Sequence, residues 1–122
     1  MERSAPRKIL FVCSINKYRS YTAEKMFDGF DRYQVRSRGT EKGARIRITE
    51  GDIGWADMIF TMEKRHTNRI REKYREAIRG KTVITLFIED IYEPMEPALI
   101  EELTLKLRRY IQVPDFPRNR QP

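Results

Sequence analysis

The chain has 122 residues, of which 39% are hydrophobic and 35% are charged. This length predicts a single domain with one hydrophobic core. Its apolar runs are too short for a membrane-spanning helix and its first residues lack the apolar run of a signal peptide, so we expect a cytoplasmic protein with no membrane partner. With Cys13 as the only cysteine, an internal disulfide and a cysteine-rich metal site are excluded.

The chain is basic, with 25 lysines and arginines against 18 acidic residues and a formal charge of +7. Such a charge favours anionic partners: phosphorylated proteins, nucleic acid or an acidic membrane surface. The basic residues are nevertheless interleaved with acidic ones, as in residues 63–65 and 69–73, and such runs usually form solvated helix faces. Because no aromatic residues are interleaved with the basic runs and no nucleic-acid-binding motif is recognised, a nucleic acid partner is not expected.

The first expected strand and helix frame the most informative stretch of the sequence. Residues 8–13 contain an uninterrupted apolar run, which is typical of a strand buried on both faces. From residue 19 to about residue 30, apolar side chains at helical spacing predict a helix. Cys13 stands at the junction of the two elements, and five residues separate it from Arg19.

The residue types at this junction suit the binding and attack of a phosphate ester. A loop that leads from a strand into a helix points backbone N–H groups into one concavity, which accommodates a phosphate-sized anion. Arg19 could add a bidentate grip on two oxygens, and the positive environment would favour the nucleophilic thiolate of Cys13. Ser20 could donate a hydrogen bond to that thiolate, and Asn16 suits a left-handed turn in a loop without glycine. The alternative is a buried, inert cysteine at the end of a core strand.

The rest of the chain alternates expected strands with expected helices, separated by loops such as residues 38–43. Thr49 suits the N-cap of a short helix that would carry Ile53 and Trp55 toward the core. The further strands are expected at residues 33–37, 58–62 and 82–88, and the longer helices from 63 to about 79 and from 97 to 111.

This alternation predicts an α/β fold: a four-stranded parallel sheet with helices on both faces, a three-layer sandwich of the flavodoxin or Rossmann type. We expect one domain over residues 1–112. Residues 113–122, with three prolines and no core-forming pattern, are expected to form a flexible tail. Ligands of such sheets bind beyond the carboxyl ends of the strands, and both Cys13 and the loop after residue 88 fall at that edge.

The Cys-x5-Arg-Ser motif of residues 13–20, placed directly after the first strand, resembles the phosphate loop of the low-molecular-weight protein tyrosine phosphatases. Two later segments are also similar to that family. They are Ser-Arg-Gly-Thr at residues 37–40 and the Trp-Ala-Asp, apolar strand and Met-Glu of residues 55–63. The resemblance covers about residues 8–112.

The resemblance implies a phosphomonoesterase that forms a phosphocysteine without metal or cofactor. Cys13 would attack phosphorus, while Arg19 and the loop amides would stabilise the phosphate oxygens. The expected partner is a phosphotyrosine-containing protein or a small aryl phosphate, with inorganic phosphate as product or inhibitor. The implied substrate-binding residues are Ser14, Ile15, Asn16, Lys17, Tyr18, Ser20 and Tyr92.

Departure of an alcohol or phenol from phosphate requires a proton donor, usually a carboxylic acid. The family places an Asp in a late loop within Asp-Pro-Tyr, and this chain has Asp-Ile-Tyr at residues 90–92. The resemblance therefore implies that Asp90 is the general acid, although Ile91 replaces the usual proline. Other nearby or late acids stay open as alternatives: Glu89, Glu93, Glu96 and Asp115.

Several further residues are expected around the pocket. Tyr92 could stack on a phosphotyrosine ring or simply pack within its loop. Ile15 and Lys17 are expected to influence substrate choice from the rim. Tyr18 stands where the family usually has a second cysteine, so no internal disulfide can protect Cys13 from oxidation. His66 follows the third expected strand and could approach the same edge to form a Cys–His pair. A lone histidine in a charged helix is more often solvent-facing, and His66 is therefore assigned no role.

Three other functions are compatible with parts of this sequence. Arsenate reduction on the same scaffold usually needs further cysteines, although a small-molecule thiol could replace them. A non-catalytic basic module would bind phosphate or nucleic acid in the same pocket without turnover. A sugar-transport phosphocarrier also uses a cysteine after its first strand, but it requires neither the Arg-Ser pair nor a late Asp.

Overall fold

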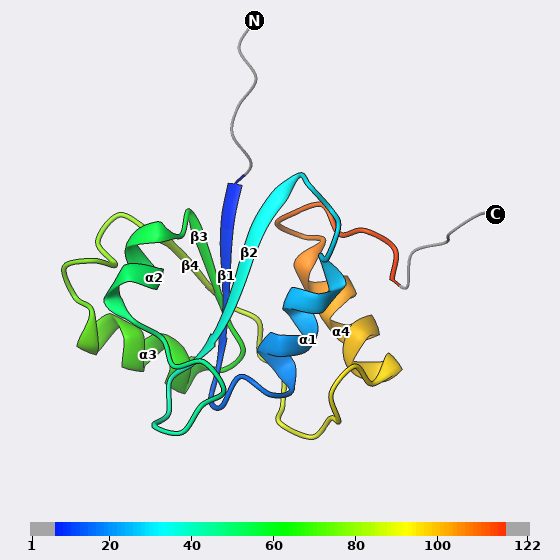
Figure 1. The fold of residues 1–122 in the computed structure, drawn as a ribbon, viewed down its shortest axis with the longest axis horizontal. Coiled ribbons are helices and arrows are strands. Elements are labelled where there is room, and N and C mark those ends of the chain that lie inside the picture. Colours follow the sequence, from blue (N-terminus) through cyan, green and yellow to red (C-terminus); the bar gives the residue numbers. More distant parts are fainter. Residues whose placement is uncertain (1–6, 117–122) are drawn as a thin grey trace, which may run out of the picture.

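A computed structural model describes residues 7–116 of the chain. Strands and helices alternate throughout this part, as the sequence predicts (Figure 1). The elements, in chain order, are β1 (Arg7–Cys13), α1 (Arg19–Met26), β2 (Tyr33–Gly39), α2 (Glu50–Trp55), β3 (Met58–Thr61), α3 (Lys64–Lys73), β4 (Thr82–Thr85) and α4 (Pro97–Leu107).

The four strands form one parallel sheet in the order β2-β1-β3-β4. Strand β1 lies between two neighbours, and its residues 9–12 are fully buried, which explains their uninterrupted apolar sequence. Helices α1 and α4 cover one face of the sheet, and α2 and α3 cover the other (Figure 1). The predicted fold class, a parallel four-stranded sheet with helices on both faces, is confirmed.

The alternation of side chains along β1 assigns Cys13 to one side of the sheet. Ile9, Phe11 and Cys13 belong to the core beneath α1 and α4, whereas Leu10 and Val12 belong to the core beneath α2 and α3. The ring of Phe11 stacks at 5.8 Å on Phe27 and at 5.7 Å on Phe60. The last residue of β1 is thus held by a packed aromatic layer directly behind it.

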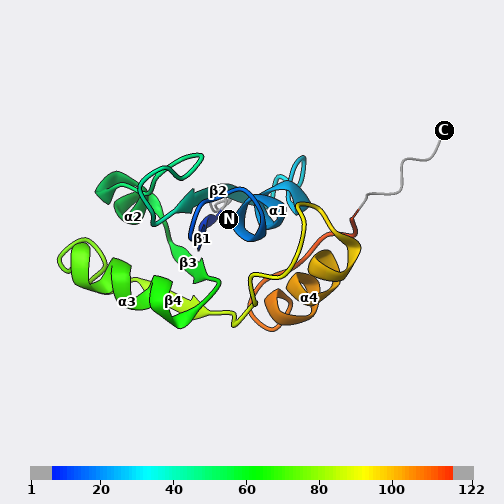
Figure 2. The ribbon, with the colours of Figure 1, turned by 90° about the horizontal axis from the view of Figure 1, so that it is seen from below.

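The loops that follow β1, β3 and β4 meet at the carboxyl edge of the sheet, which Figure 2 shows from below. Ser14 after β1 contacts His66 at the start of α3, and Arg19 contacts the carbonyl oxygen of Ile88 after β4. The ligand site expected for an open parallel sheet lies at this edge.

Helices α1 and α3 end earlier than predicted. Helix α1 ends at Met26 rather than near residue 30, because the chain turns through Gly29, which adopts a φ of 78°. Helix α3 ends at Lys73 rather than near residue 79. Its C-cap Tyr74 leaves helical geometry, and the Tyr74 hydroxyl donates to the carbonyl oxygen of Ile48 at 3.2 Å.

The fourth strand and the last helix are also shorter than predicted. The regular part of β4 ends at Thr85, because Phe87 adopts a φ of 58° and interrupts the pleat. Helix α4 ends at Leu107 rather than at residue 111, although Ile111 remains buried.

The end of the core also differs from the prediction. Val113 and Phe116 pack against the core that α1 and α4 cover, so the proposed tail boundary at residue 113 is too early. The other predicted tail residues, 117–122, lie outside the described residues. Among the helices of the described part, none combines the length and apolarity needed to span a bilayer.

Candidate active site

The loop between β1 and α1 folds around the sulfur of Cys13. Asn16 adopts a φ of 60°, which confirms the predicted left-handed residue. Its backbone N–H donates to the Cys13 sulfur at 3.3 Å, and its side-chain Nδ2 donates to Ser20 Oγ at 2.8 Å. Asn16 is completely buried, so this one residue sets both the turn and two of the hydrogen bonds that shape the loop.

The hydroxyl oxygen of Ser20 lies 2.9 Å from the Cys13 sulfur, as expected from the sequence. Ser20 Oγ accepts a hydrogen bond from Asn16 Nδ2, and its own proton can go to the sulfur or to the carbonyl oxygen of Arg38, which is farther away at 3.4 Å. A thiolate at Cys13 would therefore accept hydrogen bonds from the Asn16 amide and the Ser20 hydroxyl. Two hydrogen-bond donors thus converge on the sulfur at the centre of the loop.

The other amides of the loop are available to an anion. Within residues 7–116, these N–H groups donate to no protein acceptor: Ser14, Ile15, Lys17 and Tyr18. They precede the N-terminus of α1, whose dipole also attracts negative charge. The loop therefore has the donors that the sequence predicts for a phosphate cradle.

Arg19 is buried, and one edge of its guanidinium is fixed by the protein. Nη1 donates to the Glu63 carboxylate and, at 2.8 Å, to the carbonyl oxygen of Ile88. Its Nε and Nη2 donate no hydrogen bond within the described residues, and Nε lies 3.7 Å from the Asp90 carboxylate. The fixed edge orients the guanidinium, and the opposite edge has the two donors that can grip two oxygens of a phosphate.

Glu63 precedes α3 and connects two arginines. Its carboxylate accepts from Arg19 and from Arg65, whose Nε and Nη2 each lie 3.1 Å from a Glu63 oxygen. The hydrogen bonds from Arg65, followed by those from Arg19, lower the pKa of Glu63 to about 2. Glu63 is therefore ionised at neutral pH and can hold Arg19 as a cation in its buried position.

Among the acidic residues proposed as the general acid, Asp90 is the one that pairs with Arg19. Its side chain is 54% exposed and pairs with Arg19 at 3.7 Å. The alternatives lie elsewhere or have other contacts. Glu89 borders a neighbouring hollow, and Glu96 accepts from the backbone N–H of Glu93 at 2.9 Å. Asp115 lines a groove beside α4.

His66, to which sequence reasoning assigns no role, is buried rather than solvent-facing. Its Nε2 lies 2.9 Å from Ser14 Oγ, and its Nδ1 accepts from the backbone N–H of Glu63 at 3.0 Å. Burial, followed by the charges of Arg19 and Arg65, lowers the pKa of His66 to about 4. The signal in the sequence was positional: His66 lies three residues after the N-cap Glu63, where a side chain can bond back to the cap amide.

Gly39, in the Ser-Arg-Gly-Thr segment, allows the backbone after β2 to approach the phosphate loop. A Cβ at this position would lie 2.6 Å from the carbonyl oxygen of Ser14 and 2.6 Å from the Cβ of Ala44. Next to it, the Thr40 amide donates to the Cys13 carbonyl at 2.9 Å. Only glycine fits this contact without displacing the loop.

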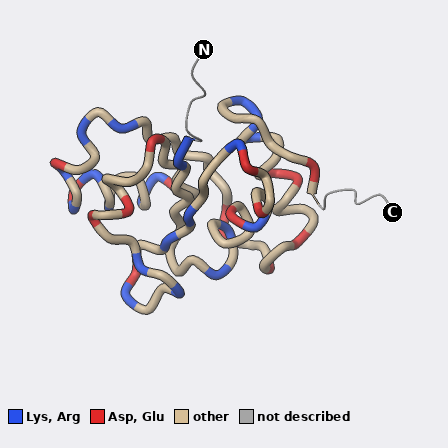
Figure 3. The backbone as a smooth tube through the Cα atoms, turned by 45° about the horizontal axis from the view of Figure 1, so that its top comes forward, with Lys and Arg blue, Asp and Glu red and all other residues tan. Residues whose placement is uncertain are grey.

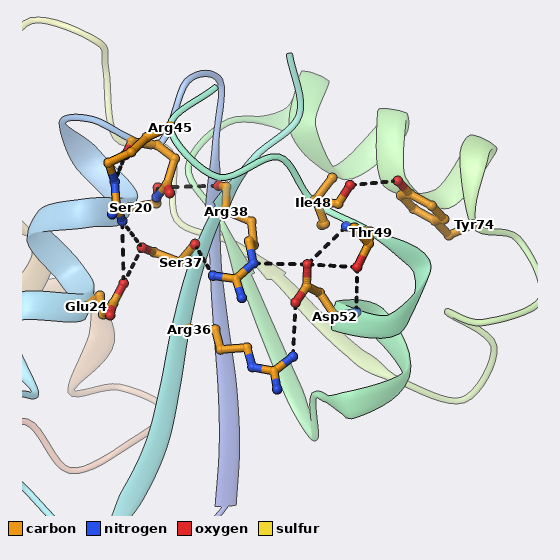
Figure 4. A network of polar contacts seen from close by, with 11 residues as sticks. Ser20, Glu24, Arg36, Ser37, Arg38, Arg45, Ile48, Thr49, Asp52 and Tyr74 are labelled. Atoms are coloured by element: carbon orange, nitrogen blue, oxygen red, sulfur yellow. Dashed lines mark hydrogen bonds and ion pairs between the residues drawn. The ribbon is translucent and has the colours of Figure 1, made fainter. Parts of the chain in front are cut away.

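A polar network behind the loop links it to β2 and α2 (Figure 4). Arg45 Nε donates at 2.9 Å to the carbonyl oxygen of Asn16, and its Nη2 lies 3.8 Å from the Glu24 carboxylate. Arg38 Nε and Arg36 Nη1 each donate at 3.0 Å to Asp52, which is 4% exposed. Asp52 also completes a capping box with Thr49, the residue that the sequence predicts as the N-cap. The left-handed turn of the loop is thereby braced from outside.

The remaining predicted residues lie around the loop. Lys17 is exposed, Ile15 and Tyr18 are partly buried, and Tyr92 packs against the core. The Tyr92 hydroxyl donates at 2.6 Å to Glu102 of α4, and this hydrogen bond raises the pKa of Tyr92 to about 12. These contacts match the packed-loop interpretation of Tyr92. No group of three or more His, Cys, Asp or Glu side chains in residues 7–116 could hold a metal ion.

Comparison of the sequence with protein-family models and with curated proteins gives no match. Solved structures do match. The tyrosine phosphatase Wzb from Escherichia coli K30, in complex with phosphate, has a TM-score of 0.68 at 20% identity over 84% of this chain and 94% of that one. A low-molecular-weight protein tyrosine phosphatase from Streptococcus pyogenes has a TM-score of 0.69 at 18% identity over 87% and 94%.

The YwlE arginine phosphatase from Geobacillus stearothermophilus also matches, with a TM-score of 0.60 at 22% identity over 85% of this chain and 94% of that one. These proteins differ in the residue that they dephosphorylate, but they share one architecture with this chain. The protein therefore has the fold of the low-molecular-weight protein tyrosine phosphatases over 84–87% of its length.

Proposed function

We propose that this protein is a cysteine-dependent phosphomonoesterase of the low-molecular-weight protein tyrosine phosphatase type. The observation that carries the proposal is the position of Arg19. Its Nη1 edge is fixed on Glu63 and Ile88, and Nε, on the opposite edge, lies 3.7 Å from the Asp90 carboxylate. A phosphate held there would meet the sulfur, the loop amides and a carboxyl group at once.

In the first step, the Cys13 thiolate attacks phosphorus and the bond from phosphorus to the ester oxygen breaks. Asp90, in its protonated form, gives its proton to the departing oxygen. The loop amides and Arg19 stabilise the negative charge on the three equatorial oxygens. The products are the free alcohol or phenol and a phosphocysteine.

In the second step, a water molecule attacks the phosphocysteine. The Asp90 carboxylate takes a proton from this water, and the phosphorus–sulfur bond breaks. Ser20 donates a hydrogen bond to the sulfur as it leaves as a thiolate. Inorganic phosphate is released, and both Cys13 and Asp90 return to their starting forms.

We assign phosphotyrosine in a protein, or a small aryl phosphate, as the substrate. The structural neighbours include both tyrosine and arginine phosphatases. Lys17 on the loop is exposed, and its positive charge would repel the cationic guanidinium group of a phosphoarginine substrate. This repulsion favours the phenol ester of phosphotyrosine. We place the activity in the cytoplasm, where a lone nucleophilic cysteine stays reduced.

The alternatives have less support. Arsenate reduction needs electrons from a thiol, and the sequence has no second cysteine to supply them. A nucleic-acid-binding module would have a concentrated basic surface, whereas basic and acidic residues are interspersed along the described chain (Figure 3).

The proposal is tested by hydrolysis of p-nitrophenyl phosphate, a phosphotyrosine peptide and a phosphoarginine peptide. Wild type is expected to release phosphate from the first two and to prefer the tyrosine peptide over the arginine peptide. The Cys13→Ser variant is expected to lose turnover but to retain phosphate binding. Turnover by Cys13→Ser at the wild-type rate, or arsenite production with a thiol in place of phosphate release, would overturn the proposal.

A further inference from the structure

Phe87, just after β4, is an exposed aromatic residue in an unfavourable backbone conformation. Its φ is 58° and it is 64% exposed. A bulky side chain at positive φ is an uncommon and energetically unfavourable conformation. The protein therefore maintains a strained backbone that keeps an aromatic ring in water.

The neighbouring backbone shows how this conformation is enforced. The amides of Leu86 and Ile88 donate at 2.8 Å to the carbonyl oxygens of Thr61 and Met62, and both side chains are buried. On the other side, the Phe87 carbonyl accepts from Lys106 Nζ at 2.7 Å. Because both flanking residues are fixed inward, the ring of Phe87 has to lie outside.

Phe87 lines a hollow of about 350 Å³ next to the candidate active site. Two of its other lining residues, Glu63 and Ile88, are the residues that hold Arg19 Nη1. The hollow therefore borders Arg19 on its Nη1 side, beside the candidate active site and opposite the guanidinium edge that would grip the phosphate. Its complete lining is Glu63, Lys64, Arg65, Phe87, Ile88 and Glu89.

The charges around the hollow do not favour an anionic occupant. The Arg65 guanidinium is already paired with the Glu63 carboxylate through two hydrogen bonds of 3.1 Å. The lining also contains one further carboxylate, Glu89, and one further cation, Lys64. With these charges balanced, the exposed ring of Phe87 is the apolar surface that a ligand can cover, since Ile88 is already buried.

We propose that this hollow is a substrate subsite, which binds an apolar or aromatic side chain flanking the phosphorylated residue of a protein substrate. The inference rests on the proposed phosphatase function and adds a sequence preference to it. A second copy of the chain is the other conceivable occupant, and the experiment below separates the two.

The test uses pairs of phosphotyrosine peptides, one pair for each position that flanks the phosphotyrosine. The two peptides of a pair differ only in having Leu or Ser at that position. The main variant is Phe87→Gly, because glycine adopts positive φ without strain and should preserve the loop. Phe87→Asn, which also tolerates this φ, serves as a second variant. The control is Leu105→Ala, which removes a 49%-exposed apolar side chain from α4.

At one flanking position, we expect wild type to have a kcat/KM about tenfold higher for the Leu peptide than for the Ser peptide. Burial of one apolar side chain gives an effect of this size. Both Phe87 variants should reduce this ratio toward one through KM, and Leu105→Ala should retain it. An unchanged ratio in both Phe87 variants, or no preference in wild type, would overturn the proposal.

Two further measurements keep the outcomes distinct. Binding of the same fluorescent peptides to Cys13→Ser measures the preference without turnover. If wild type hydrolyses no substrate but the Leu peptide still binds more tightly through Phe87, the phosphatase function fails and the subsite stands. Sedimentation analysis tests self-association: a dimer that Phe87→Gly dissociates, with no effect on peptide preference, would assign the hollow to a second copy and overturn the subsite.

Discussion

The imidazole Nε2 of His66 lies 2.9 Å from the hydroxyl oxygen of Ser14, the residue directly after Cys13. The other ring nitrogen accepts from the backbone N–H of Glu63, so a neutral imidazole carries its proton on Nε2 and donates it to Ser14. One buried ring thus connects the phosphate loop after β1 to the start of α3, where Glu63 holds Arg19.

Replacement of this ring should weaken the loop. We expect His66→Leu to lose about 1–3 kcal/mol of stability and to raise the dissociation constant for inorganic phosphate, because the amide of Glu63 loses its acceptor. His66→Gln should largely rescue both properties, since glutamine at the third helical position can bond back to the cap residue. Chemical denaturation and phosphate titration check this. Equal phosphate affinity in His66→Leu and wild type would contradict the link to the loop.

The lowered pKa of His66 also predicts a pH dependence of stability. In the folded protein the pKa is about 4, against an ordinary value of 6.5, so the unfolded chain binds more protons between these values. Stability should therefore fall as pH decreases from about 6.5 to about 4, by roughly 2–3 kcal/mol from this group. Denaturant unfolding at several pH values measures it. The loss should be clearly smaller in His66→Gln, and an identical pH profile in that variant would be the contrary result.

The Glu63 carboxylate should act by orienting Arg19. In Glu63→Gln the charge that fixes Nη1 is lost, and we expect kcat/KM for p-nitrophenyl phosphate to fall by 10- to 100-fold, about 1.4–2.7 kcal/mol. Arg65→Gln removes the other, more exposed partner of Glu63 and should have a smaller effect. Steady-state kinetics of both variants make the comparison. A larger loss in Arg65→Gln would contradict the assigned order.

The contact at Gly39 predicts a substitution that damages the loop from behind. A Cβ would meet backbone at 2.6 Å, so Gly39→Ala should cost about 1–3 kcal/mol of stability and reduce phosphate affinity. Gly54→Ala is the matched control, because a Cβ there meets no atom within 4 Å. That control should be neutral or stabilising by up to about 1 kcal/mol. Thermal unfolding distinguishes the two, and equal stability of the variants would refute the steric argument.

Local sequence patterns predicted the features that depend on neighbouring residues. The apolar run of β1 gave a central buried strand, and Asn16 gave the left-handed turn of the loop. The contacts of Ser14 with His66 and of Arg19 with Glu63 join residues 52 and 44 positions apart. Such contacts depend on how α3 packs beside β1, which no local pattern encodes.

Phe87 illustrates the same limit at the level of the backbone. Residues 82–88 have the composition of one continuous strand, and the sequence gives no sign of a positive φ within it. The hydrogen bonds of the flanking amides to β3 and the contact from Lys106 decide the conformation. These are tertiary interactions, so the exposed ring became visible only in the folded chain.

The central claim is that the sulfur of Cys13 takes the phosphoryl group from the substrate. The most direct measurement is rapid acid quenching of Asp90→Asn during turnover of p-nitrophenyl phosphate, followed by mass spectrometry of the peptide that contains Cys13. Because loss of the Asp90 base slows hydrolysis of the intermediate, we predict a phosphoryl group on Cys13 and none in Cys13→Ser. An active enzyme with an unmodified Cys13, or with the phosphoryl group on another residue, would contradict the claim.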